Sequence, residues 1–226
     1  MRSNEAPGKE ISRKKTAQTP PKAVEVSKRE RILDVAERLF AEGGFDGVSM
    51  RDIASAAEVG LPLIVYHFET KLNLYRALFE RRKTVLDSRL TMLHAPLTRG
   101  EDLLEHIVRA FVLPVMENQN TAAGLAYAKL VAREASDPRE AERGIVRDFF
   151  DPFAAEFIKA ISEVLPRQGS GYAHWAYLFA VGALVMSALD GRIERISGGK
   201  IKAGMSKAKT EHLVSFITAG IRAGAK

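Results

Sequence analysis

The stretch that decides the fold of this chain is SMRDIASAAEVGLPLIVYHF, residues 49–68. Ser49 can cap the free N–H groups at the start of a helix, and Asp52 follows it at the spacing of a capping box. The run at residues 58–60, Glu-Val-Gly, interrupts that helix. A second helix then begins with Pro62 near its first position, where the missing N–H costs nothing. The stretch therefore predicts two short helices around a tight turn.

Two such helices suit the major groove of DNA, because the first can brace the second and the second enters the groove by its N-terminal end. The second helix and the residues after it offer polar and aromatic side chains: Tyr66, His67 and Lys71. Leu61, Leu63 and Val65 are apolar, and they could touch thymine methyl groups or belong to the core. Short helical hairpins also occur in unrelated all-α proteins, so the pattern alone leaves both interpretations open.

The remainder of the chain also has helical periodicity. Ile32, Ala36 and Phe40 follow a helical stripe that ends at Gly43-Gly44. Further helices are predicted at residues 27–42, 70–93, 101–118, 121–135, 138–165, 171–197 and 207–223. No stretch alternates like a strand with hairpin signals. The predicted fold class is therefore all-α, with about nine helices.

The N-terminal segment, residues 1–26, is polar, rich in lysine and broken by prolines, so we expect a disordered basic arm. Residues 1–27 hold six Lys/Arg against three Glu, which is half of the net charge of +6. A basic balance fits a polyanionic partner, although a passive tail fits as well. We expect three parts: the arm, a helix-turn-helix domain at residues 27–82, and a larger helical domain at residues 83–226.

Composition excludes several kinds of site. The chain has no cysteine, so it has no disulfide or thiolate metal site. Its polar start predicts no secretory signal and a cytoplasmic location. Residues 172–189 carry no Asp, Glu, Lys or Arg, but they include His174 and are diluted by Ala and Gly. A helix buried in protein on most sides is favoured there over a membrane span.

The sequence disfavours two alternative functions. A small helical enzyme is disfavoured, because no histidine has metal-binding spacing and the sequence GKIKAG at residues 199–204 lacks the rest of a phosphate loop. We therefore expect no catalytic residue, metal or cofactor. A non-specific architectural DNA-binding protein is disfavoured because residues 28–82 hold nine basic and nine acidic residues. Purely electrostatic binding to DNA needs more positive charge.

The segment RERILDVAERLFAEGGF, residues 29–45, together with SMRDIA at residues 49–54 and YHFETK at residues 66–71, resembles the tetracycline-repressor (TetR) family. The resemblance covers about residues 28–82. It implies a three-helix DNA-binding domain on an all-α domain that senses a ligand and forms a homodimer. It also implies a transcriptional repressor that binds palindromic operator double-stranded DNA and is released from it by a small molecule.

The resemblance assigns roles by position. Arg51 corresponds to a helix residue near the DNA backbone, and Lys71 to the family's phosphate-contacting lysine. The recognition helix would contain Leu61, Pro62, Leu63, Tyr66 and His67. Val65 stands where the family usually has tyrosine, and residues 60–62, Gly-Leu-Pro, replace a more usual Val-Ser start. These departures bear on the operator sequence rather than on the family.

In the second domain, residues 172–196 and 207–223 fit the family's pair of dimerising helices. LVARE at residues 130–134, DFFDPF at residues 148–153 and the late Trp175 are similar to a subgroup that includes fatty-acid-responsive regulators. This similarity implies a small apolar effector, such as a fatty acid or acyl-CoA. The candidate ligand-binding residues are Phe111, Tyr127, Arg133, Phe149, Phe153, Trp175 and Phe179. The aromatic residues could instead be core, and Arg133 could pair with a local carboxylate rather than anchor an acidic ligand.

Overall fold

The computed structural model describes residues 1, 27–168, 171–189, 191–202, 204 and 206–225. The predicted basic arm, apart from Met1, lies outside the described residues. The regular structure in these ranges is helical, with no strand, which confirms the predicted all-α class. The elements are α1 (Lys28–Gly43), α2 (Met50–Ala56), α3 (Leu61–Phe68), α4 (Lys71–Arg81), α5 (Lys83–Leu93), α6 (Leu103–Asn118), α7 (Ala122–Ser136), α8 (Glu140–Arg143), the π-helical η1 (Val146–Phe150), α9 (Asp151–Val164), α10 (Tyr172–Leu189), α11 (Arg192–Ile196) and α12 (Lys207–Gly224).

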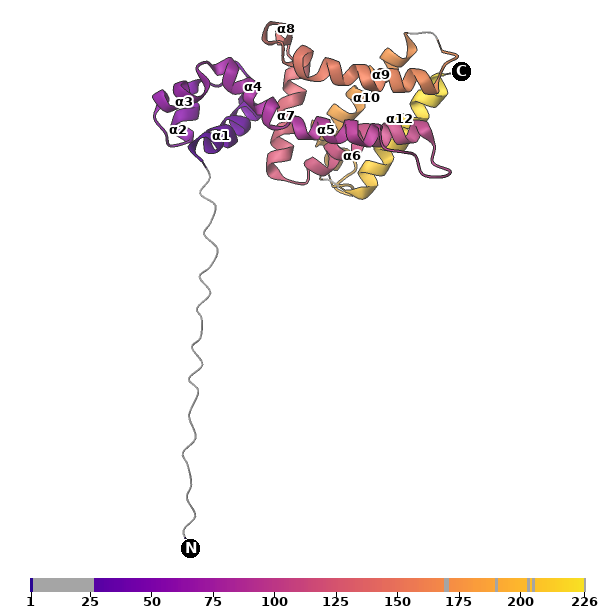
Figure 1. Cartoon of the computed structure of the whole chain (residues 1–226), viewed down its shortest axis with the longest axis horizontal. Helices are drawn as coiled ribbons and strands as arrows, with labels where there is room; N and C mark the ends of the chain where they lie inside the picture. Colours follow the sequence, from indigo (N-terminus) through magenta and orange to yellow (C-terminus); the bar gives the residue numbers. More distant parts are fainter. Residues whose placement is uncertain (2–26, 169–170, 190, 203, 205, 226) are drawn as a thin grey trace.

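The helices fall into a small unit and a larger bundle. Helices α1 to α3 lie together at one end of the molecule, and α4 leads from them into the bundle of α5 to α12 (Figure 1). Helix α7 lies where the two parts meet.

Local side chains set the starts of the first helices. The side chain of Ser27 accepts a hydrogen bond from the backbone N–H of Glu30 at the start of α1. Ser49 and Asp52 form the predicted capping box at α2, and Thr70 caps α4. These bonds satisfy N–H groups that a helix leaves without an internal partner, so the sequence fixes the starts locally.

Three predicted helices are each divided in the structure, so the expectation of about nine helices was too low. The predicted helix 70–93 is divided at Arg82, the predicted helix 138–165 into α8, η1 and α9, and the predicted helix 171–197 into α10 and α11. At Arg82 the backbone leaves helical geometry (φ −95°, ψ 7°), and Arg81 and Arg82 both form ion pairs with the buried carboxylate of Glu37 in α1. Gly144, with φ 65°, ends α8 in the left-handed region that glycine tolerates.

Two apolar cores hold the chain together, and α7 contributes to the first of them. That core contains the buried residues of α1 to α4 together with Tyr127 and Leu130 of α7. The second core joins α5, α6, α9, α10 and α12. The predicted boundary after residue 82 coincides with the break between α4 and α5, but the first core continues past it into α7.

Helix α10 differs from the expectation that it is buried on most sides. Ala176, Ala180 and Leu184 are buried, whereas Trp175 and Phe179 on another face are 58% and 68% exposed. Ala176 and Ala180 lie beside α12 and Tyr177 packs against Phe111, whereas Trp175 and Phe179 point outward, so one side of the helix is in the core and the other is exposed. No helix within the described ranges is long and apolar enough to cross a membrane.

Candidate DNA-reading helix and ligand cavity

Helix α3 has one buried face and one exposed face. Ile64 and Phe68 are buried in the first core, and they fix the rotation of the helix. Tyr66 is 80% exposed, and Pro62 is exposed beside it. Gly60 precedes the helix and provides no side-chain cap, so the first N–H groups of α3 have no side-chain acceptor there. The arrangement presents an aromatic side chain and a helix N-terminus outward, as a groove-reading helix requires.

The apolar residues of α3 divide between the two roles that the sequence left open. Leu61 and Leu63 are half-buried and pack against the first core, whereas Val65 is exposed. His67 is half-buried, and its ring meets the ring of Tyr66 edge to face at 5.2 Å. Tyr66, Val65 and Pro62 therefore offer the freest atoms for base contacts.

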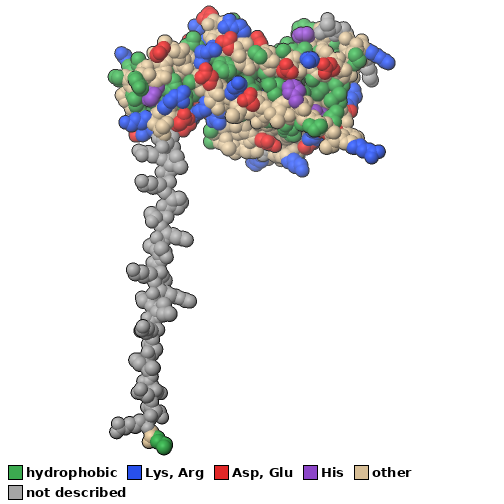
Figure 2. Space-filling model, viewed as in Figure 1, with side chains coloured by type: hydrophobic (Ala, Val, Ile, Leu, Met, Phe, Trp, Pro, Cys, Tyr) green, Lys and Arg blue, Asp and Glu red, His purple; other side chains and the backbone are tan. Residues whose placement is uncertain are grey.

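The charged residues around α3 are mixed in sign. Arg51 lies exposed on α2 and forms no ion pair with any described residue. Basic and acidic side chains alternate over the α1–α4 end of the molecule in Figure 2. This mixed surface agrees with the neutral count for residues 28–82 and points to positioned contacts rather than a general positive field.

Lys71 occupies a more constrained place than the sequence suggested. Its ammonium donates hydrogen bonds to the backbone oxygens of Phe45 (2.9 Å) and Val48 (3.0 Å), and it lies 4.3 Å from the centroid of the Phe45 ring. Partial burial holds the pKa of Lys71 below its ordinary value. Lys71 thus ties the loop between α1 and α2 to the start of α4, and one of its three N–H groups remains for a phosphate.

The turn between α2 and α3 contains an unusual backbone conformation. Glu58 has φ 51°, in the left-handed region that residues other than glycine adopt at a cost. Its carboxylate forms an ion pair with Arg31 of α1. This contact holds the turn against the first helix of the unit.

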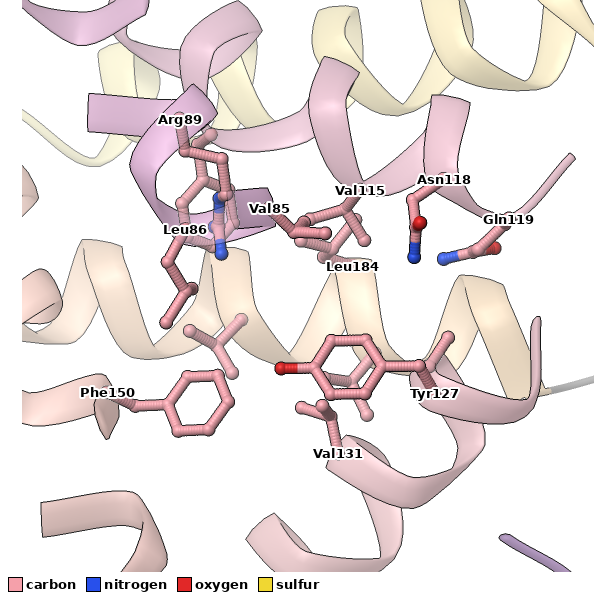
Figure 3. A pocket seen from close by; sticks show the side chains of 14 residues that line it. Val85, Leu86, Arg89, Val115, Asn118, Gln119, Tyr127, Val131, Phe150 and Leu184 are labelled. Carbon is pink, nitrogen blue, oxygen red and sulfur yellow. The ribbon is translucent and has the colours of Figure 1, made fainter. Parts of the chain in front are cut away.

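The larger bundle contains a partly open apolar cavity of ≈ 100 Å³. Helices α5, α6, α7 and α10 and the π-helical η1 surround it (Figure 3). The lining residues are Val85, Leu86, Arg89, Phe111, Val115, Asn118, Gln119, Tyr127, Ala128, Val131, Phe150, Val181, Leu184 and Val185. Most of these side chains are apolar, so the cavity suits a ligand with an apolar body.

Among the described residues of this lining, Arg89 is the charged one, and the sequence pattern did not single it out. Its side chain points from α5 into the cavity, and the residue is only 5% exposed. Its Nε and Nη2 atoms form no hydrogen bond with any described residue. Burial lowers the pKa of Arg89 to about 10, so the guanidinium stays protonated near neutral pH. Its position three residues after Leu86, on the buried stripe of α5, is the sequence signal that could have found it.

Aromatic rings hold the Arg89 guanidinium in place. Its central carbon lies 4.3 Å from the ring centroid of Phe111 and 4.2 Å from that of Phe153. The hydroxyl of Tyr127 and the amide nitrogen of Gln119 also line the cavity and have no partner among the described residues. Burial raises the pKa of Tyr127, so its hydroxyl remains a neutral donor.

The seven predicted ligand-binding residues do not come together. Phe111 and Tyr127 line the cavity, and Phe153 packs against Arg89 from outside the lining set. Trp175 and Phe179 lie on the exposed face of α10, away from the cavity, whereas Val181, Leu184 and Val185 are the residues of that helix that line it.

Arg133 lies away from the cavity as well. It is exposed, and its Nε donates to the backbone oxygen of Ala41 at 2.7 Å, which joins α7 to the end of α1. The structure pairs it neither with an enclosed ligand site nor with Glu134. Glu134 instead bonds to Arg143 and Tyr75.

Phe149 and its neighbour Phe150 connect the cavity with α4. Phe150 lines the cavity, and its ring lies 6.2 Å from that of Phe79 in α4. The ring centroid of Phe79 also lies 6.1 Å from that of Phe149 and 6.0 Å from that of Tyr127. A π-helical turn widens the helix and places successive side chains differently from an α-helix. Two cavity residues, Tyr127 and Phe150, therefore pack beside Phe79 of α4, the helix that follows α3.

A three-helix reading unit joined to a ligand-sized cavity in a helical bundle defines a DNA-binding regulator with a sensing domain. Residues 32–78 match the sequence profile of the bacterial regulatory proteins of the tetR family, and residues 109–220 match the tetracyclin repressor-like C-terminal domain. The chain belongs to the TetR family and is a DNA-binding transcription regulator.

Individual relatives agree with this assignment. The HTH-type transcriptional activator FasR of Mycolicibacterium smegmatis is 25% identical over 172 residues, which are 71% of this chain and 68% of FasR. The negative transcriptional regulator IcaR of the Staphylococcus aureus biofilm operon icaADBC is 22% identical over 138 residues, 60% of this chain and 70% of IcaR. The crystal structure of a TetR-family transcriptional regulator from Bordetella parapertussis has the same fold, with a TM-score of 0.61 and 17% identity over 84% of this chain and 93% of that one. These comparisons give no support to the enzyme alternative.

Proposed function

We propose that the chain is a homodimeric, cytoplasmic repressor that binds a palindromic operator through α3 and leaves it when an apolar ligand occupies the cavity. The observation that carries this proposal is the contact of Phe79 with both Tyr127 and Phe150. A ligand that displaces Tyr127 or Phe150 would also shift α4 and, with it, the DNA-contacting helix α3.

The dimer rests on an exposed apolar surface of α10 and α12. Trp175 and Phe179 stack with their ring centroids 6.0 Å apart, and Phe216 of α12 is 71% exposed. A groove of ≈ 290 Å³ runs between the two helices and includes Phe179 and Phe216 in its walls. Contiguous apolar surface of this kind marks an interaction site, and a second copy would cover it. A two-fold dimer would place its two α3 helices on two equivalent half-sites.

Repression is the proposed direction of regulation. IcaR is named a negative regulator and FasR an activator, so relatives of this chain work in both directions. Steric exclusion of polymerase needs only tight operator binding, which α3 and the dimer can supply. A reporter gene behind the operator tests this directly, because loss of the regulator should raise expression if it represses and lower it if it activates.

The proposed effector is apolar and acyl-like, with a fatty acid or an acyl-CoA as the candidate classes. The apolar lining of the cavity and the similarity of residues 130–134 and 148–153 to fatty-acid-responsive regulators support it. The ligand must bind the operator-incompetent conformation better than the competent one, since equal affinity for both shifts nothing. A coupling of about 1–3 kcal/mol would change operator affinity roughly 5- to 150-fold.

The test uses the full-length protein on DNA from upstream of its own gene. Fatty acids of graded chain length and their coenzyme A esters are titrated into the complex while fluorescence anisotropy of the labelled DNA is recorded. Release of the DNA supports an acyl effector. If none of these compounds releases the DNA and a cationic or polar compound does, the proposed effector class is wrong, and the protein is a regulator with a different effector.

A further inference from the structure

We propose that the effector is a free monocarboxylic acid with a compact apolar body, and that Arg89 binds its carboxylate in the cavity. This inference rests on the proposed function, since it takes the cavity to be the effector site. It adds the chemistry of the head group and the residue that recognises it.

One edge of the Arg89 guanidinium lacks a hydrogen-bond acceptor. Nε and Nη2 lie on the same edge of the planar guanidinium, and both are buried without an acceptor among the described residues. Two parallel N–H groups on one edge match the two oxygens of a carboxylate in a bidentate pair. A buried cation without a partner is costly, so a ligand that supplies the anion gains the energy of satisfying it.

The surroundings of Arg89 contain rings rather than acids. The faces of Phe111 and Phe153 hold the guanidinium by cation–π contact and leave its edge free. No acidic residue is among the described residues that line the cavity. The missing counter-ion therefore has to come from the ligand.

The other unpartnered polar atoms of the cavity are also donors or neutral hydroxyls. The Tyr127 hydroxyl points into the cavity from α7, and Gln119 contributes an amide N–H beside Asn118 (Figure 3). A ligand that satisfies them must carry acceptor oxygens. A carboxylate supplies acceptors and a negative charge together, whereas the thioester of an acyl-CoA supplies a neutral carbonyl that leaves Arg89 uncompensated.

The size of the cavity limits the rest of the ligand. An engineered apolar cavity of about 150 Å³ holds one benzene molecule. The cavity of ≈ 100 Å³ is smaller than that but partly open, so it favours a compact body, such as a single ring or a short alkyl chain beside the carboxylate, over a long acyl chain. Benzoate and hexanoate are suitable probes for this class.

The experiment measures binding to the full-length protein without DNA. Isothermal titration calorimetry compares benzoate and hexanoate with methyl benzoate and hexan-1-ol, which keep the apolar body and lose the charge, and with palmitate and palmitoyl-coenzyme A. We expect the two small acids to bind and the neutral analogues and long-chain compounds to bind much more weakly. Equal binding of acids and neutral analogues would refute recognition of a carboxylate. Preference for the long-chain compounds would refute a ligand with a compact apolar body.

Two variants assign the site to Arg89. Arg89→Met should weaken binding of the acids about 10- to 150-fold, the loss expected for hydrogen bonds to a charged group. Arg38→Met, which changes an exposed arginine of α1, should leave it unchanged. Thermal melts without ligand separate a binding role from a structural one: the melting temperature of Arg89→Met should stay the same or rise, because a buried unpaired cation has been removed. A large fall in it, with acid binding retained in Arg89→Lys and Arg89→Met alike, would make Arg89 structural and refute the inference.

The operator complex distinguishes this inference from the proposed function. If acids bind through Arg89 but do not release DNA, the carboxylate site is supported and the proposed release of DNA by the ligand is refuted. Neutral apolar compounds that release DNA, with no binding of acids, would refute the carboxylate and leave the mechanism intact.

Discussion

The hydroxyl of Tyr75 in α4 donates a 3.0 Å hydrogen bond to the buried carboxylate of Glu134 in α7. Glu134 also accepts a bond from Nε of Arg143, at 3.0 Å to the same oxygen. Burial and the nearby carboxylate raise the pKa of Tyr75, so it stays a neutral donor. The helix that follows the reading unit is thus fastened to the larger bundle by a buried polar network as well as by apolar packing.

Removing Glu134 should therefore cost far more than removing Tyr75's hydroxyl. Glu134→Ala removes the acceptor of both Tyr75 and Arg143 Nε and leaves Asp137 as the remaining acidic partner of Arg143, so it should lower the free energy of unfolding by about 2–4 kcal/mol. Tyr75→Phe removes one hydrogen bond and should lower it by about 1 kcal/mol. Urea unfolding followed by circular dichroism measures both, and similar losses for the two variants would contradict the network.

Phe79→Leu should weaken the communication between cavity and operator. The smaller side chain loses the ring contacts with Tyr127 and Phe150. Operator and ligand affinities measured separately should change little, while the coupling between them should fall by about 0.5–2 kcal/mol. Ile161→Val is the matched control, because Ile161 is buried in the second core and does not line the cavity. Coupling that falls equally in both variants would argue against a specific role for Phe79.

Tyr66 and Lys71 should affect DNA binding in different ways. Tyr66→Ala should alter sequence preference, since this exposed side chain lies on the outer face of α3. Lys71→Ala should weaken binding to all sequences alike and reduce the slope of log affinity against log salt by about 1. A selection from random DNA, with binding measured at several salt concentrations, tests the assignment. A change of base preference in Lys71→Ala alone would reverse the two roles.

Lys71→Ala should also loosen the loop between α1 and α2. The ammonium holds the carbonyls of Phe45 and Val48, so its loss should lower the melting temperature of the protein. Arg51→Ala removes an exposed arginine with no ion pair to the described residues and should weaken DNA binding without lowering the melting temperature. Hydrogen exchange at residues 44–49 separates the two effects, because only Lys71→Ala should raise it.

Phe216→Asp should separate the proposed dimer. A charge in the groove between α10 and α12 would have to be desolvated in the interface. Size-exclusion chromatography with light scattering should give a mass near 25 kDa for the variant and near twice that for the wild type, as the protomer is 24.9 kDa. Ser215→Asp changes the preceding exposed residue, which does not line the groove, and should remain dimeric. A wild-type mass of one protomer at micromolar concentration would refute the dimer.

Gly124 should not tolerate a side chain. A Cβ atom there would lie 1.7 Å from the backbone oxygen of Asn118, so the start of α7 would have to move away from the end of α6. Gly124→Ala should lower the free energy of unfolding by about 1–3 kcal/mol, in the range of overpacked sites. Gly182→Ala meets no atom within 4 Å and lies within α10, so as the control it should keep or raise the melting temperature.

The sequence predicted those parts of the fold that depend on neighbouring residues. Ser49, Asp52 and Thr70 act within one helical turn, and the structure shows their capping bonds as expected. The break at Arg82 was not predicted, because it accompanies ion pairs with Glu37, which lies 45 residues earlier in the chain. Long-range pairing of this kind leaves no local pattern.

The candidate ligand site was harder to predict for a related reason. Arg133 follows the apolar run at residues 130–132, whereas Arg89 is flanked by Ser88 and Asp87 and is enclosed by the rings of Phe111 and Phe153, which come from other helices. Trp175 and Phe179 were interpreted as pocket residues because large aromatic residues are usually buried. A surface that a second protomer would cover has the same composition as a core, so sequence alone does not separate them.

The sharing of α7 between the reading unit and the bundle has a consequence for engineering. Tyr127 and Leu130 complete the core that α1 to α4 begin, so a fragment cut after Arg82 would expose Tyr75, Phe79 and their neighbours to water. Such a fragment is not an independent module. A hybrid regulator designed to have this operator specificity has to include α7 as well. Exchanging only residues 27–82 into another scaffold would require the new host to supply a matching helix surface.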